Sequence, residues 1–277
     1  MKLKHCTDRE EIEIKLLLDG IYQLYGLDFR DYVFSSIRRR IWYRIKMEKL
    51  HTVSQLLERV LHEPEMMEKL YLDFSINVTE MFRDPSFFLA LRKKVLPTLK
   101  TLPVIRIWHA GCSTGEEVYS MAILLKEEGL YDKTKIYATD INEKVLTVAK
   151  EGEFPLKKMQ GYTNNYIRSG GIYDFSEYYS VRNNSALFNR NLTKNMTFAQ
   201  HNLVSDGSLN EFHLIICRNV LIYFNKPLQE RVHSLFYNSL CKHGYLGLGN
   251  RESLMSKIKG YQVIDANEKI YQKSVEE

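Results

Sequence analysis

The residues with the clearest chemical potential lie in a short glycine-containing segment, residues 109–117 (HAGCSTGEE). The segment follows an apolar run at residues 104–108 that is typical of a buried strand, and it opens an apolar helix that reaches about Leu125. Small residues at such a turn let the backbone approach a ligand closely at the carboxyl edge of a sheet. The adjacent carboxylates of Glu116 and Glu117 suit a cationic ligand, such as a sulfonium, better than a pyrophosphate. The alternative is an ordinary turn whose glutamates stabilise a helix N-terminus.

A second acid strengthens the ligand-binding interpretation. The strand expected at residues 135–140 ends in Asp140, where an acid can hold the two hydroxyl groups of a ribose. Asp140 could instead cap the next helix, but Asn142 competes for that role. An adenosine with a cationic tail satisfies both features, which favours S-adenosylmethionine (SAM) over a dinucleotide.

The elements that must position these residues change in character along the chain. Residues 1–98 have helical periodicity, and the pair Asp84-Pro85 predicts a helix start with Asp84 as the N-cap. From residue 104 onward, strands alternate with helices, which implies βαβ units and a parallel sheet. We expect further strands at residues 196–199, 212–216 and 245–248, and a strand pair around Asn267 at residues 261–273.

Two segments of this second part need separate predictions. A helix should open at Pro227, reach about Leu240 and stop at Gly244. Residues 154–195 interrupt the strand–helix alternation, are rich in Tyr, Asn and Ser, and have no long apolar helix face. We interpret them as an insertion that forms, in part, a small antiparallel sheet.

Composition narrows the class of protein. The 277 residues carry a net charge of +5, and the four cysteines form no CxxC pair, which argues against a disulfide framework or a zinc site. No apolar run approaches the ~20 residues of a membrane span, and the start is too charged for a signal peptide. We therefore expect a cytoplasmic protein without membrane insertion and without a bound metal.

The positive charge is concentrated in one expected helix. Residues 37–50 carry a net charge of +5, the same as the whole chain, which is narrower than the basic surface of most duplex binders. On a helical wheel, Phe34, Ile37, Ile41 and Ile45 form an apolar stripe. Arg40 and Arg44 flank this stripe on one side, and the other basic residues spread around the far side: Arg38, Arg39, Lys46 and Lys49. A solvated basic face is the alternative to docking on an acidic partner.

Several segments, taken together, identify a family. They are residues 77–85 (NVTEMFRDP), 110–120 (AGCSTGEEVYS), 138–142 (ATDIN), 201–203 (HNL) and 217–224 (CRNVLIYF). In this order they closely resemble the CheR family of chemotaxis receptor methyltransferases, over nearly the whole chain. Residues 247–253 (GLGNRES) resemble the family's closing Gly-x-Ser-Glu segment but depart from it at Asn250 and Arg251.

The resemblance implies an α/β fold of a Rossmann-like SAM-dependent methyltransferase. It implies a helical domain over residues 1–98, for receptor docking and cleft closure, and a methyltransferase domain over residues 99–277 with a β-subdomain inserted at about 154–195. The positions that match cofactor-binding residues of the family are Asn77, Thr79, Arg83, Glu117, Asp140, Asn202, Leu203, Arg218 and Asn219. Arg40 and Tyr223 match residues beside the transferring methyl group. Simpler roles stay open for Leu203 as core and for Arg218 as a buried salt bridge.

The implied reaction moves the methyl group of SAM to glutamate side chains of chemoreceptors and leaves S-adenosylhomocysteine (SAH). A glutamate carboxylate has a reference pKa of about 4.3, so the nucleophile is already ionised and the enzyme has mainly to position it. The implied partner is the acidic helices of a receptor, with no nucleic acid, and we expect a monomer. The alternatives are a signalling adaptor that binds SAM or SAH without turnover, and a methyltransferase for another protein or a nucleic acid.

Overall fold

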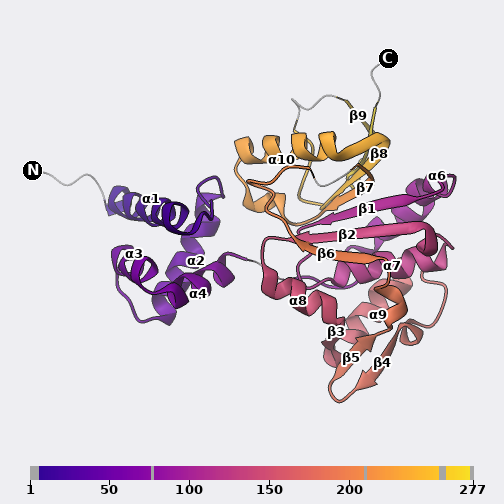
Figure 1. Cartoon of the computed structure of the whole chain (residues 1–277), viewed down its shortest axis with the longest axis horizontal. Helices are drawn as coiled ribbons and strands as arrows, with labels where there is room; N and C mark the ends of the chain where they lie inside the picture. Colours follow the sequence, from indigo (N-terminus) through magenta and orange to yellow (C-terminus); the bar gives the residue numbers. More distant parts are fainter. Residues whose placement is uncertain (1–5, 76–77, 209–210, 256–259, 275–277) are drawn as a thin grey trace, which may run out of the picture. The chain divides into compact units, whose positions relative to one another are not determined.

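The computed structural model describes residues 6–75, 78–208, 211–255 and 260–274 (Figure 1). The chain divides into two compact units, one of Met1–Ile76 with Ile222–Gln229, the other of Asn77–Leu221 with Glu230–Glu277. The division therefore lies near residue 76, earlier than the boundary at residue 98 expected from the sequence. The physical reason is that Phe87, Phe88 and Leu91 are fully buried in the core cluster of the second unit.

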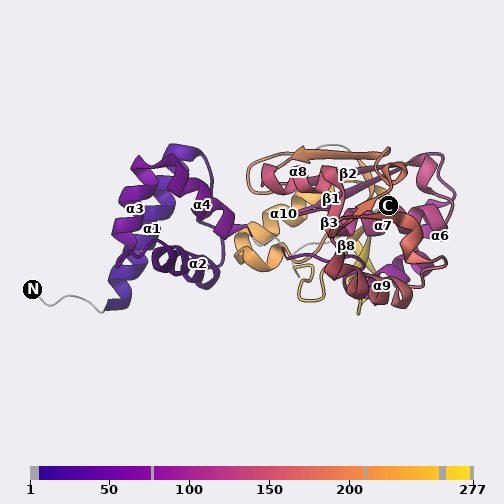
Figure 2. The same cartoon turned by 90° about the horizontal axis from the view of Figure 1, so that it is seen from below.

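The first unit is a bundle of four helices (Figure 2). They are α1 (Cys6–Tyr25), α2 (Phe34–Met47), α3 (Val53–His62) and α4 (Pro64–Phe74). Thr52 and Gln55 form a capping box that fixes the start of α3. The predicted stripe of α2 is confirmed for Ile37, Ile41 and Ile45, which are buried, but wrong for Phe34, which is 42% exposed. Phe34 is the first residue of the helix, where the Cα–Cβ bond tilts toward the N-terminus and beyond the helical turns that carry the isoleucines.

The segment Ile222–Gln229 joins this unit through the loop before α2. Val33 N donates to Tyr223 O at 2.8 Å, and Asn225 N donates to Asp31 O at 2.8 Å. The rings of Tyr32 and Phe224 pack edge to face with centroids 5.0 Å apart. These contacts hold Tyr223 at a defined place beside α2.

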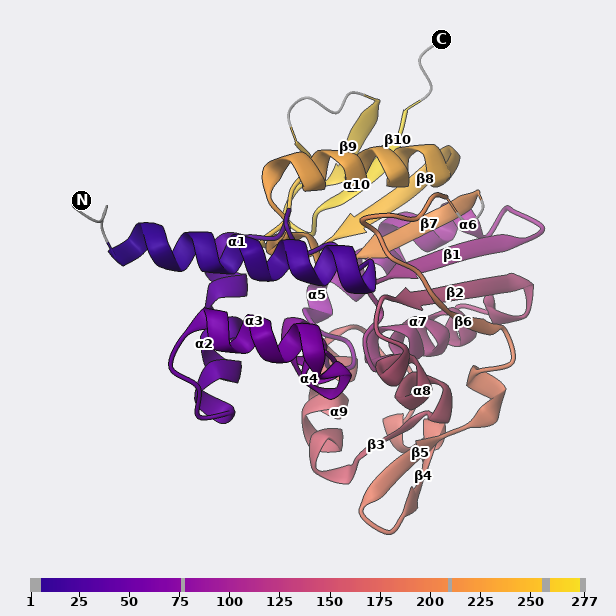
Figure 3. The ribbon, with the colours of Figure 1, turned by 60° about the vertical axis from the view of Figure 1, so that its left-hand side comes forward.

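The second unit contains a seven-stranded sheet, which Figure 3 shows from β9 at the top to β6. Its strands are β1 (Ile105–Ala110), β2 (Thr134–Asp140), β6 (Met196–Gln200), β7 (Phe212–Cys217), β8 (Leu240–Leu248), β9 (Tyr261–Asp265) and β10 (Ile270–Lys273). The strand order is β6-β2-β1-β7-β8-β10-β9, with the first five parallel and β10 antiparallel to both β8 and β9. The predicted strands and the final strand pair are confirmed.

The helices of this unit connect and cover the strands. They are α5 (Pro85–Ala90), a π-helical turn (Leu91–Val95), α6 (Leu96–Leu99), α7 (Glu116–Glu127), α8 (Glu143–Glu151), α9 (Met159–Arg168) and α10 (Lys226–Ser239), whose first residues belong to the other unit. Short 3₁₀ turns lie at Tyr131–Lys133, Leu156–Lys158, Phe175–Tyr178, Arg190–Leu192 and Leu221–Tyr223. The prediction that Gly244 stops α10 is wrong, because α10 ends at Ser239 and Gly244 lies inside β8. None of the helices in the described part of the chain is long and apolar enough to cross a membrane.

The insertion forms a three-stranded antiparallel sheet, as expected, with β3 (Glu153–Pro155), β5 (Ser185–Phe188) and β4 (Tyr179–Arg182) in that order (Figure 1). It also contains α9, which the sequence analysis missed. The inner face of α9 is aromatic rather than aliphatic: Tyr162 and Tyr166 are buried and donate their hydroxyl groups to Glu116 and Glu127 of α7.

Candidate functional site

The candidate site follows from the sheet topology of the second unit. The chain passes from β1 through α7 to β2 on one side, and from β7 through α10 to β8 on the other, while β1 and β7 are neighbours. Open α/β sheets bind ligands where the connections diverge in this way, at the carboxyl edge. The loops after β1, β2, β6 and β7 carry most of the predicted cofactor residues.

The turn between β1 and α7 has the backbone conformation that its small residues predict. Gly111, Ser113 and Gly115 have φ angles of 77°, 51° and 93°, a region that L side chains avoid. A Cβ at Gly111 would lie 2.5 Å from Val220 Cγ2, and one at Gly115 would lie 2.9 Å from the Cβ of Ala149. Both positions therefore require glycine for conformation and for space.

Asp140 ends β2 and faces this turn. Its Oδ2 accepts a hydrogen bond from Ser113 N at 2.9 Å, and its Oδ1 accepts one from Asn142 N at 3.0 Å. Burial raises the pKa of Asp140, and the hydrogen bonds that its carboxylate accepts from backbone N–H groups oppose that shift. Asn142, as predicted, caps α8 by accepting from Lys144 N at 2.9 Å. The carboxylate of Asp140 is thereby held in one orientation at the carboxyl edge.

Glu117 and Arg218 form a paired centre between β1 and β7. Arg218 is buried and donates to Glu117 Oε2 at 3.1 Å, to Asp84 Oδ2 at 2.6 Å and to the Arg83 carbonyl at 3.1 Å. His109 Nδ1 lies 3.0 Å from Glu117 Oε1. Burial of Glu117 favours its neutral form, but His109 and Arg218 outweigh this and lower its pKa. The structure shows Arg218 in the buried ion pairs that the sequence left open as its simpler role.

The segment before α5 reaches this centre through the Arg83 carbonyl and the Asp84 side chain. Asn77 lies outside the described residues. Thr79 and Arg83 are half-buried, and Arg83 Nη1 donates to the Val78 carbonyl at 3.1 Å. As predicted, α5 begins at Pro85 with Asp84 at the N-cap position, but the Asp84 side chain makes no cap bond. Asp84 has a left-handed φ of 55°, and its carboxylate pairs with Arg218 instead.

The loops after β6 and β7 contain the remaining predicted positions. Asn202 and Leu203 follow β6 and are partly buried, so Leu203 is not a simple core residue. Asn202 Oδ1 accepts from Val204 N at 2.9 Å, which shapes the loop locally. Asn219 follows Arg218 with a left-handed φ of 62°. Thus the second unit places six of the predicted positions at the carboxyl ends of β1, β2, β6 and β7 or in the segments that directly follow: Glu117, Asp140, Asn202, Leu203, Arg218 and Asn219. Arg83 joins them through the bond from Arg218 to its carbonyl.

Arg40 and Tyr223 are neighbours in the first unit. The guanidinium carbon of Arg40 lies 5.3 Å from the centre of the Tyr223 ring. Arg40 Nη1 donates to the carbonyls of Asp73 and Phe74, at 2.7 and 2.8 Å, at the end of α4. Within the described residues both hydrogen bonds leave from Nη1, so Nη2 and Nε keep donors for another group. Arg40 is thus a fixed, mostly buried cation with free donors.

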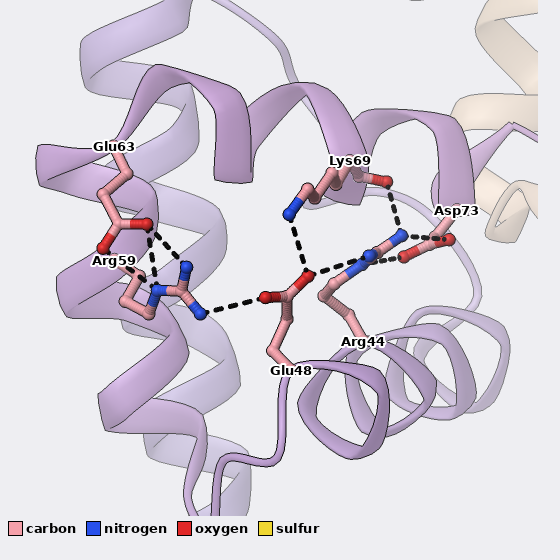
Figure 4. Close-up of polar contacts among 6 residues, drawn as sticks. All are labelled: Arg44, Glu48, Arg59, Glu63, Lys69 and Asp73. Carbon is pink, nitrogen blue, oxygen red and sulfur yellow. Dashed lines mark hydrogen bonds and ion pairs between the residues drawn. The ribbon is translucent and has the colours of Figure 1, made fainter.

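Arg44 differs from Arg40, although both flank the same stripe. Figure 4 shows Arg44 in a network with Asp73 and Glu48. Arg44 Nε and Nη2 donate to the two oxygens of Asp73 at 2.6 and 2.9 Å, and Nη1 donates to Glu48 Oε1 at 3.2 Å. Arg59 and Lys69 also contact Glu48. Arg44 is therefore held in a structural network and, unlike Arg40, has bonds from all three guanidinium nitrogens.

Comparison with known proteins shows which family the chain resembles. The CheR methyltransferase, SAM binding domain, matches residues 77–270, and the CheR methyltransferase, all-alpha domain, matches residues 12–75. The chain belongs to the CheR methyltransferase family. The limits of the two CheR domains meet at the division between the two structural units. The chain is accordingly a SAM-dependent methyltransferase.

Individual relatives align along most of the chain. Cher3 of Pseudomonas putida KT2440 is 52% identical over 244 residues, which cover 88% of this chain and 89% of Cher3. A chemotaxis protein methyltransferase of Listeria monocytogenes is 29% identical over 238 residues, covering 83% and 86% of the two chains. One of Borreliella burgdorferi is 28% identical over 258 residues, covering 87% and 88%.

The residues at the carboxyl edge fit SAM chemically. Asp140 is an oriented acceptor for ribose hydroxyls, and Ser113 Oγ beside it is buried without a hydrogen-bond partner among the described residues. The turn at Gly111 admits no side chain, because Val220 of the loop after β7 packs against it there. Within the described part of the chain, no cluster of three or more His, Cys, Asp or Glu could hold a metal ion.

Two acids of this edge were missed as site elements by sequence reasoning. Asp84 was interpreted as a cap, and Glu252 only as part of the segment 247–253 that resembles the family's closing motif. A lone arginine directly after a buried strand is the available signal for Asp84, because a buried guanidinium needs acidic partners. For Glu252, the signal is an acid that follows the last buried strand by a short glycine-containing turn.

Proposed function

We propose that this protein transfers the methyl group of SAM to glutamate side chains of chemoreceptors and produces glutamate γ-methyl esters and SAH. The observation that carries the proposal is the similarity to proteins named chemotaxis protein methyltransferases over 83% and 87% of the chain, together with the matches to the all-α and the SAM-binding domains of the family. The proposed setting is the cytoplasm, with a monomeric enzyme.

The residues of the second unit would bind and orient the cofactor. Asp140 would accept hydrogen bonds from the ribose hydroxyls, because its carboxylate is already held by Ser113 N and Asn142 N. Glu117 would lie near the cationic methionine end, and its bonds to His109 and Arg218 keep it ionised. The other positions proposed to contact or surround SAM are Asn77, Thr79, Arg83, Asn202, Leu203, Arg218 and Asn219. SAM supplies an electrophilic methyl group on sulfur when bound.

Arg40 would receive the substrate carboxylate. Its Nη2 and Nε donors can form a paired contact with a glutamate side chain, while the bonds from Nη1 to the α4 carbonyls hold the guanidinium still. Tyr223, which packs near this guanidinium, would lie beside the transferring methyl group. No general base is required because the glutamate is ionised at neutral pH.

The outer face of α2 would dock on the acidic helices of the receptor. Arg39, Lys46 and Lys49 are exposed, whereas Arg38 is exposed but already paired with Glu10 at 2.6 Å. Complementary charge favours the encounter with a carboxylate-rich helix and makes it salt-dependent.

The test is SAH formation on receptor-containing membranes. Wild-type protein with SAM should produce SAH on membranes whose receptors carry glutamates, and none on membranes whose methylation-site glutamates are replaced by glutamine. Binding of SAM without SAH production would identify the adaptor alternative. Equal turnover on both membranes would point to a different acceptor.

A further inference from the structure

The carboxylate of Glu252 joins the loop after β8 to the loop after β7. Glu252 is 5% exposed. Its Oε2 accepts from Gly249 N at 2.6 Å and Asn219 N at 3.0 Å, and its Oε1 accepts from Val220 N at 2.9 Å and Leu221 N at 2.8 Å. Four backbone N–H groups thus converge on one buried carboxylate, which is an arrangement that a neutral side chain cannot reproduce.

The backbone around Glu252 is built to make this contact. A Cβ added at Gly249 would lie 2.7 Å from Glu252 Oε2 and 2.9 Å from Asn219 N, so only glycine leaves room for the carboxylate. Asn219 adopts a left-handed φ of 62°, which turns successive N–H groups toward the acid. We call this set, Gly249, Glu252 and the amides of residues 219–221, the Glu252 clasp.

The clasp fixes residues that reach the rest of the carboxyl edge. Arg218 directly precedes the clasped amides and bonds to Glu117 and Asp84. Val220 lies against the turn after β1, since its Cγ2 occupies the space that a side chain at Gly111 would need. The position of one short loop therefore determines both the Arg218 ion pairs and the wall of the β1–α7 turn.

We propose that Glu252 is a positioning residue for the cofactor site, acting through the loop at residues 218–221. The inference rests on the proposed placement of SAM beside Arg218 and Asn219. The departure from the family pattern at Asn250 and Arg251 then has no effect on the site, because both residues are exposed and only the glycine before them and the acid after them form the clasp.

Replacement of Glu252 by glutamine tests this directly. Glu252→Gln keeps the size of the side chain but removes acceptor capacity and adds two donors that face backbone N–H groups. We expect amide hydrogen exchange in residues 218–221 to accelerate, and SAH affinity measured by calorimetry to fall about tenfold or more, because buried donors lose their acceptor. Glu252→Asp keeps the charge and should bind SAH with an affinity between those of Glu252→Gln and the wild type.

The controls separate positioning from general destabilisation. Asn250→Ala and Arg251→Ala alter the same turn and should leave both exchange and affinity unchanged. Gly249→Ala places a Cβ 2.7 Å from Glu252 Oε2 without changing any charge. It should show the same faster exchange and weaker SAH binding, and it replaces Glu252→Gln as the test if Glu252→Gln folds poorly.

The outcomes are distinguishable. Faster exchange with unchanged SAH affinity would overturn the positioning role while leaving the proposed function intact. If residues 218–221 of Glu252→Gln exchange their amide hydrogens as slowly as in the wild type, the clasp does not hold the loop, and the positioning role is also overturned. Protected amides in a wild-type protein that binds neither SAM nor SAH would refute the cofactor site and, with it, a positioning role toward that site.

Discussion

Removal of Arg218 should destabilise the second unit by an amount that its contacts allow us to work out. Arg218→Met keeps most of the side-chain volume over the Phe87 ring, which lies 4.2 Å from the guanidinium carbon. It leaves the carboxylates of Asp84 and Glu117, whose side chains are 31% and 17% exposed, without their cation. Breaking a buried ion pair costs about 3–5 kcal/mol, and the partial exposure of both acids places this case near about 3 kcal/mol.

Denaturation of the purified protein measures this cost. A loss of about 3 kcal/mol corresponds to a fall in Tm of about 6–12 °C at this chain length. Chemical denaturation followed by circular dichroism should show the same loss as a lower midpoint with an unchanged slope. Arg38→Met, which removes an exposed partner of Glu10, is the matched control and should leave the midpoint unchanged.

A compensating variant checks the reasoning. Arg218→Met combined with Asp84→Asn and Glu117→Gln removes all three charges and should recover most of the lost stability, because no unpaired carboxylate remains. If the free energy of unfolding of Arg218→Met lies within about 1 kcal/mol of the wild-type value, the ion pairs do not contribute the stability assigned to them. If the triple variant is less stable than Arg218→Met, unpaired charge is not the cause of the loss.

Three further predictions concern cofactor binding, turnover and pH. Asp140→Ala should weaken SAH binding by at least about tenfold, because it removes the proposed ribose acceptor and releases Ser113 N, whereas Asp132→Ala should bind normally in the same calorimetric titration. Arg40→Ala should retain SAH affinity but lose most SAH production on receptor membranes; unchanged turnover would refute its role. Burial lowers the pKa of His233 to about 4. The unfolded state therefore binds more protons than the folded state between pH 6.5 and 4. The free energy of unfolding should fall by about 3 kcal/mol as the pH drops through that window. His233→Leu should remove this pH dependence, and a wild-type stability that is flat from pH 6.5 to 4 would contradict the assignment.

Much of the fold follows from patterns that act over short distances. Strands β1, β2 and β7 carry apolar residues on both faces, because parallel strands inside a sheet are covered on both sides, so their positions could be predicted from the sequence. The helix α9 could not, because its inner face uses Tyr162 and Tyr166, whose hydroxyl groups need the distant acids Glu116 and Glu127. Likewise, Gly244 suggests a helix stop, yet tertiary pairing with β7 places it in β8.

In the candidate site, too, some features follow from the local sequence and others depend on distant contacts. The turn at Gly111 and the acid at Asp140 were predictable, since each follows a recognisable strand. The pairing of Arg218 with Asp84 joins residues 134 positions apart and has no local signature. The difference between Arg40 and Arg44 also could not be predicted, because it depends on Asp73 of α4 reaching only one of them with its side chain.

The most direct test of the central claim is transfer of labelled methyl from SAM to a chemoreceptor, followed by treatment with alkali. A glutamate methyl ester hydrolyses in base, so we predict that label enters the receptor band in the presence of this protein and is released as methanol at high pH. Label that enters the receptor but resists alkali, or that enters no receptor while SAM is bound, would contradict the assignment of this chain as a receptor glutamate methyltransferase.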